Sequence, residues 1–103
     1  MDEQKRKKDV LDILNYHAYV IMKTISNEKY PFYSVLLEKT GIVRSTLNYK
    51  INQLLEFDLI NVEYIQDKNT KQRSKPRALY KLTDKGQEVL KCLEKIREIC
   101  SKS

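Results

Sequence analysis

Residues 39–60 read KTGIVRSTLNYKINQLLEFDLI, and this stretch decides the fold. Its apolar residues recur at i, i+4 and i+7, namely Leu47, Ile51 and Leu54. This spacing predicts a helix with one apolar face from about Arg44 to Phe57. Gly41 favours the end of a preceding helix, because glycine readily takes the left-handed conformation of a C-cap. The stretch therefore predicts a tight helix-turn-helix over about residues 34–57.

The residues before this stretch predict three elements. Ser34 is a good N-cap for the short helix that ends near Gly41. Further upstream, apolar residues spaced by three and four predict one amphipathic helix from about Lys8 to Ile25. Pro31 stands in an aromatic run and forbids helix continuation, so a short edge strand is expected there.

After the helix-turn-helix, the sequence period changes to that of a strand. Residues 60–64 and 78–82 alternate in character, which predicts two antiparallel strands in a wing over about residues 60–82. Between them, QDKNTKQRSKPR at 66–77 carries one acidic residue, Asp67, and five cations: Lys68, Lys71, Arg73, Lys75 and Arg77. The connection is thus a basic hairpin tip.

The last segment predicts a helix over about residues 83–101. Thr83 and Asp84 supply an N-cap and an acidic first turn. Its apolar residues are spaced four, three and four: Val89, Leu93, Ile96 and Cys100. This is the seam of a short coiled-coil-like pairing, so we expect the last helix and the first to join two copies of the chain. The alternative is that the last helix packs only on its own core.

Composition and length bound the class of protein. The 103 residues fit a single domain, 1–103, and 41% hydrophobic residues support a packed core. A net charge of +6 favours an anionic partner, which is nucleic acid, an acidic protein or a membrane surface. No apolar run approaches the roughly 20 residues that a membrane helix needs, and polar residues interrupt any signal-peptide core. We expect an intracellular, cytoplasmic protein with no membrane partner.

Neither a metal site nor a catalytic set is expected. The two cysteines, Cys92 and Cys100, are eight residues apart, unlike any zinc motif, and His17 is the single histidine. They are expected to be buried free thiols, or Cys100 forms an interchain disulfide with its dimer mate. The sequence holds no glycine-rich phosphate loop and no Cys–His arrangement with an orienting group, so no enzyme activity and no cofactor are expected.

Two motifs resemble those of known regulators. Residues 39–60 resemble the helix-turn-helix of MarR-like and ArsR-like regulators, with a turn glycine, a Ser–Thr start and a hydrophobic exit into the wing. ALYKLTDKG, at 78–86, is similar to the end of the wing and the start of the next helix in the same families. The resemblance implies a winged helix-turn-helix, a mainly α fold with a small antiparallel β wing (α+β).

One position departs from the pattern. Asp58 stands where those families commonly have glycine, so a left-handed turn there is possible but less favourable than it would be for glycine. The size, the lysine-rich composition and the terminal seam also resemble small winged-helix regulators of archaea and their viruses.

These features together predict binding of double-stranded DNA. The major groove is about 12 Å wide and admits one helix, whose N-terminal residues read the base edges. Projection of the third helix at 100° per residue directs these residues away from the apolar stripe: Ser45, Thr46, Tyr49 and Gln53, flanked by Lys50. Arg44, at the helix start, and Asn48, which is expected closer to the core side, are further candidates for DNA contact. Such residues are also often merely solvated, and the neighbouring basic wing favours the DNA interpretation.

In the hairpin tip, Arg73 is the candidate for insertion into an A·T-rich minor groove. The other cations, Lys68, Lys71, Lys75 and Arg77, are candidates for phosphate contact, unless the tip is a soluble loop without a partner. We expect the chain to be a sequence-specific transcription regulator that acts as a repressor and forms a homodimer. The dimer should bind an inverted repeat in DNA, with its two recognition helices about 34–36 Å apart. The alternatives are a protein-interaction module and a nonspecific DNA-coating protein.

Overall fold

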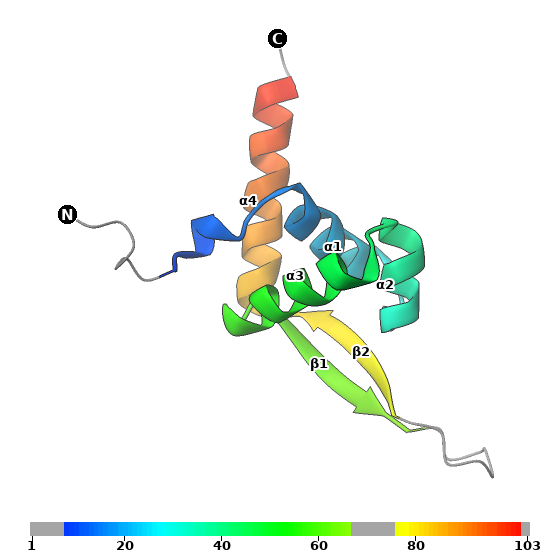
Figure 1. Cartoon of the computed structure of the whole chain (residues 1–103). Helices are drawn as coiled ribbons and strands as arrows, with labels where there is room; N and C mark the ends of the chain where they lie inside the picture. Colours follow the sequence, from blue (N-terminus) through cyan, green and yellow to red (C-terminus); the bar gives the residue numbers. More distant parts are fainter. Residues whose placement is uncertain (1–7, 67–75, 102–103) are drawn as a thin grey trace.

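The computed structural model describes residues 8–66 and 76–101 and has the expected α+β architecture (Figure 1). Its elements in chain order are η2 (Val10–Asp12), α1 (Tyr16–Asn27), α2 (Tyr33–Thr40), α3 (Arg44–Glu56), β1 (Ile60–Ile65), β2 (Arg77–Leu82) and α4 (Asp84–Ser101). The strands form an antiparallel pair that extends away from the helices as a wing, and α4 projects on the opposite side (Figure 1). Among the described residues, no helix is long and apolar enough to span a membrane.

The core forms where the apolar faces of the helices meet the base of the wing. Leu47 and Leu54 of α3 are fully buried and Ile51 is 3% exposed, which confirms the predicted stripe. They belong to one cluster with buried residues from α1, α2, both strands and α4. Burial of this apolar surface is the main stabilising contribution to the fold.

The first helix is shorter than predicted, and the expectation of one helix from Lys8 to Ile25 is wrong. Asp9 caps the short η2 turn by accepting a hydrogen bond from Leu11 N at 2.9 Å. Asn15 has an extended backbone and caps α1, its Oδ1 accepting from Ala18 N at 3.0 Å. Two side-chain caps in succession satisfy local amides and break the helix between residues 12 and 16.

The turn between α2 and α3 forms as the sequence predicts, but α2 starts at a different residue from the one predicted. Gly41 takes the left-handed conformation, with φ of 68°. The N-cap of α2 is Phe32, without a side-chain hydrogen bond, so the prediction of Ser34 as the N-cap is wrong. Instead of a short edge strand around Pro31, one antiparallel bridge joins Phe32 to Leu79.

The wing is joined to the helices by a compact corner. Asp58 adopts the left-handed conformation with φ of 61°, although aspartate takes this conformation less readily than the glycine common at this position in the similar families. The Asp58 carbonyl accepts a hydrogen bond from Thr83 Oγ1 at 2.7 Å. Thr83 Oγ1 in turn accepts a hydrogen bond from Gly86 N at 2.9 Å. The predicted N-cap at Thr83 is therefore confirmed, and it also ties the start of α4 to the exit from α3.

The seam predicted on α4 divides into two parts. Val89 and Leu93 are half-buried against the core of their own chain. Ile96 is 55% exposed, and Cys100 is exposed as well. Cys92 is also exposed, so the expectation of buried thiols is wrong. The first half of α4 thus closes the domain, and the second half leaves apolar side chains in solvent.

Candidate nucleic-acid interface

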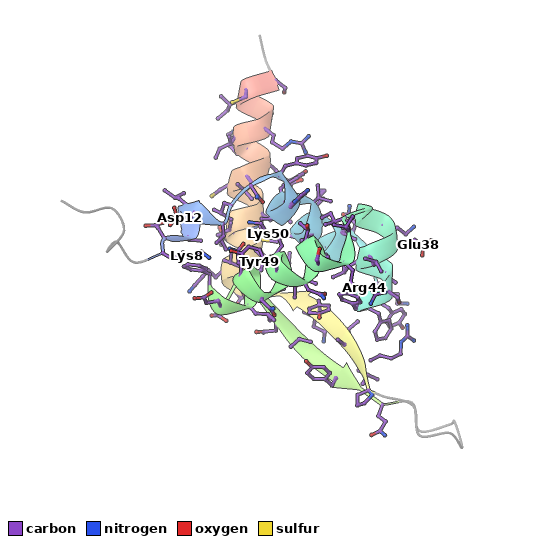
Figure 2. The ribbon with its side chains drawn as sticks, in the orientation of Figure 1. Lys8, Asp12, Glu38, Arg44, Tyr49 and Lys50 are labelled. Carbon is purple, nitrogen blue, oxygen red and sulfur yellow. The ribbon has the colours of Figure 1, made fainter. Side chains whose placement is uncertain are left out.

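The outward face of α3 is polar and accessible. Arg44, Ser45, Asn48 and Tyr49 are exposed, and Thr46 is half-buried. The buried stripe lies on the other side of the same helix, because residues three and four apart share a face. Figure 2 shows Arg44 at the end of α3 beside α2, with Tyr49 further along the helix. This face is free to approach a large ligand.

The N-terminus of α3 suits an anion. Its N-cap, Val43, is 65% exposed and makes no side-chain capping hydrogen bond. The first amides of the helix therefore point outward without a side-chain cap, and the helix dipole adds partial positive charge there. Arg44 stands at the first position of the helix. A phosphate group is the natural ligand for this combination.

A residue of α2 contacts two of the candidates on α3. The Tyr33 hydroxyl donates a hydrogen bond to Asn48 Oδ1 at 2.5 Å. The guanidinium carbon of Arg44 lies 5.7 Å from the centre of the Tyr33 ring, within the range of a cation–π contact. Projection of α3 alone could not reveal Tyr33, because it lies on another helix.

Two predicted contacts fall on the wrong side of the helix. Lys50 and Gln53 are each only 6% exposed, so the prediction that they reach DNA is wrong. Lys50 Nζ donates a hydrogen bond to the Ile13 carbonyl at 2.8 Å. Burial lowers the pKa of Lys50, and the nearby charge of Lys8 lowers it further.

The segment before α1 explains this burial. Ile13 is fully buried, and its carbonyl is the acceptor for Lys50. Lys8, in the same segment as Ile13, also lies beside α3, and its Nζ is 5.7 Å from the centre of the Tyr49 ring (Figure 2). A neighbouring segment therefore covers a helix face that projection of an isolated helix leaves open to solvent.

The end of the wing next to the hairpin tip adds a second cationic element. The guanidinium carbon of Arg77 lies 3.8 Å from the centre of the Phe32 ring, so this arginine stacks at the start of β2. Lys81 pairs with Glu63 across the strands at 3.4 Å, and Tyr64 is 68% exposed. The other predicted wing cations, Lys68, Lys71, Arg73 and Lys75, lie outside the described residues.

Comparisons with known proteins place this geometry among regulators. No model of a known protein family matches the chain, and no curated protein does. A PadR-like transcription factor from Bacteroides fragilis is 26% identical, with a TM-score of 0.70 over 82% of each chain. A putative MarR-family transcriptional regulator from Porphyromonas gingivalis is 22% identical, with a TM-score of 0.70 over 100% of this chain and 96% of its own.

A third solved structure is Bordetella bronchiseptica BpsR, whose DNA binding is regulated by 6-hydroxynicotinic acid. It is 16% identical, with a TM-score of 0.70 over 97% of this chain and 69% of its own. The chain therefore has the winged helix-turn-helix fold found in PadR-like and MarR-family regulators.

Proposed function

We propose that the chain is a sequence-specific regulator of transcription that binds double-stranded DNA as a homodimer and represses by occluding a promoter. The observation that carries this proposal is the exposed polar face of α3, which stands beside the wing and opposite a fully buried stripe. A helix in this position is what the major groove admits. Residues 1–103 act as one winged-helix unit in this proposal.

The proposed roles follow from exposure. Asn48 and Tyr49 read base edges, and Arg44 contacts guanine or a phosphate at the start of α3. The hydroxyls of Ser45 and Thr46 bind phosphate near the positive end of the helix. On the wing, the proposed phosphate or minor-groove contacts are Arg77 and the tip residues Lys68, Lys71, Arg73 and Lys75.

The proposed partner for the end of α4 is a second copy of the chain. Ile96 and Ile99 are 55% and 59% exposed, and a groove of about 260 Å³ beside α4 is lined by Leu93, Ile96 and Tyr19. Residues 94–98 carry two acidic and two basic side chains, so this part of α4 has no excess of like charge that would repel a second copy. Such a dimer presents two α3 helices to an inverted repeat.

Selection of duplexes from a random pool tests DNA binding and sequence preference together. Arg44→Ala and Tyr49→Ala should each weaken binding to the selected duplex at least tenfold. Lys91→Ala removes an equal charge from an exposed position on α4 and should bind as the parent does. Equal binding by the parent and both α3 variants would refute the proposed surface.

Salt dependence separates DNA binding from the alternatives. Affinity should fall steeply with salt, with a log–log slope near −0.9 per phosphate neutralised, whereas a protein-interaction module should show no DNA binding. Competition with random duplex separates site recognition from nonspecific coating. A reporter whose promoter overlaps the selected site tests repression, and increased expression would indicate activation instead.

Light scattering after size-exclusion chromatography tests the dimer. Ile96→Glu should yield a monomer without loss of fold, because Ile96 is exposed within one chain. Lys91→Glu, at an exposed position on the same helix outside the groove lined by Leu93 and Ile96, is the control and should remain dimeric. A monomeric parent would contradict the proposal. Gel mobility with and without reductant tests the interchain disulfide at Cys100, and a monomer band in both lanes excludes it.

A further inference from the structure

The side chain of Asn48 is held by a residue outside α3. Its carboxamide oxygen accepts the hydroxyl proton of Tyr33, on α2, at 2.5 Å. Both Asn48 and Arg44 are exposed, and the ring of Tyr33 lies beneath the Arg44 guanidinium. One half-buried tyrosine therefore orients two exposed side chains of the proposed recognition helix.

We propose that Tyr33 is a positioning residue that sets base specificity by leaving Asn48 as a hydrogen-bond donor. A carboxamide has one oxygen that accepts and one NH₂ group that donates. The carboxamide oxygen has two lone pairs, and the Tyr33 hydroxyl already engages one of them. The NH₂ group is not engaged in this way, so it is the end of the Asn48 carboxamide that is more available to DNA. This inference rests on the proposed function and names the bases that α3 selects.

The consequence follows from the edges that bases present in the major groove. An asparagine that reads adenine uses both ends of its carboxamide, because adenine offers a donor at N6 and an acceptor at N7. Guanine offers two acceptors, O6 and N7, and thymine offers O4. The arrangement at Asn48 therefore favours guanine, with its two acceptors, over adenine and thymine, which offer one acceptor each, and it selects against cytosine, which offers only a donor.

Arg44 extends the same preference. Its guanidinium carries donors only, and guanine is the base that pairs with it through two hydrogen bonds. Arg44 and Asn48 lie four residues apart, so they share a face of α3 about 6 Å apart along its axis. Base pairs are spaced by about 3.4 Å, so the two side chains reach positions one or two base pairs apart. We expect the half-site to carry acceptor-rich bases at both positions.

The test compares bases selected from a random duplex pool at fixed salt. Asn48→Ala first identifies the base position that Asn48 reads, because preference there is lost. Tyr33→Phe keeps the ring under Arg44 and frees the carboxamide oxygen. The ratio of adenine to guanine at that position should then rise at least about fivefold, the lower end of the discrimination of one bidentate pair. Tyr30→Phe removes the hydroxyl of an exposed tyrosine three residues before Tyr33 and should leave the ratio unchanged.

A second variant avoids any change at Tyr33. Asn48→Asp, at an exposed position, replaces the donor group with an acceptor and should move the preference to cytosine, which offers a donor at N4. An unchanged ratio in Tyr33→Phe, retained guanine preference in Asn48→Asp, or no position lost in Asn48→Ala would overturn the inference while the proposed function stands. A parent without any sequence preference would overturn both.

Discussion

Replacement of Gly86 with alanine sets local helix propensity against tertiary packing at the start of α4. A β-carbon built on Gly86 would lie 1.9 Å from the carbonyl oxygen of Leu59, more than 1 Å closer than such atoms approach each other in proteins. The obstacle is backbone, so no side-chain rotation relieves it. Helix propensity acts in the opposite direction, because alanine is favoured over glycine by about 1 kcal/mol within a helix.

The clash should outweigh the propensity. Relief requires α4 to move away from Leu59, and that motion strains the hydrogen bonds by which Thr83 joins Asp58 to Gly86. Overpacking of this kind costs about 1–3 kcal/mol, and a shift above 1 Å belongs at the upper end. We expect Gly86→Ala to lower the free energy of unfolding by about 2 kcal/mol and Tm by roughly 10 °C.

Urea and thermal denaturation followed by circular dichroism measure this loss. Gln87→Ala is the matched control, because Gln87 is exposed in the same turn and its backbone hydrogen bond to Thr83 is retained. The control should change the free energy of unfolding by less than about 0.5 kcal/mol. A Gly86→Ala protein as stable as the parent, or more stable, would refute the close approach of α4 to Leu59.

Three further changes test other features of the structure. Lys50→Met removes a buried ammonium group whose pKa is lowered by burial, so the charged form is less favourable in the folded state. The parent should therefore gain stability relative to this variant as pH rises from the lowered pKa toward 10.5, and a constant difference in the free energy of unfolding would contradict this. Gln53→Leu removes a buried Oε1 without a partner among the described residues. It should raise the free energy of unfolding by about 1 kcal/mol and leave base preference unchanged, and the reverse result would place Gln53 on the DNA side. Phe32→Leu removes the ring under Arg77 and should lower the free energy of unfolding by about 1 kcal/mol. Tyr30→Leu at a 59% exposed position should have less effect, and equal losses would argue against the stacked arginine.

Local sequence signals predicted the elements whose causes are local. The i, i+4, i+7 spacing on α3 defined its buried stripe, and Gly41 and Thr83 marked a helix end and a helix start. Period-two alternation predicted the two strands of the wing. These features depend on side-chain spacing, capping and backbone conformation within a few residues, so neighbouring residue types are enough to predict them.

Local signals also misled where two of them competed. The apolar pattern predicted one helix from Lys8 to Ile25, but Asn15 is the N-cap of α1 and interrupts that helix. The Asn15 side chain satisfies a free amide at the start of α1, and this capping outweighed the apolar spacing. The spacing did not reveal the break, because apolar residues can keep the same spacing on both sides of an interruption. The cap at Asn15 was present in the sequence as a signal that competed with the longer pattern.

The sequence by itself determined that a polar helix face, an apolar stripe and a basic hairpin follow one another in the order of a winged helix. Only the tertiary structure decided which polar residues of α3 stay accessible, because the segment around Ile13 covers Lys50 while Tyr33 holds Asn48 at the surface. Contacts between residues 37 and 15 positions apart in the chain leave no periodic trace, since each depends on how separate elements pack together.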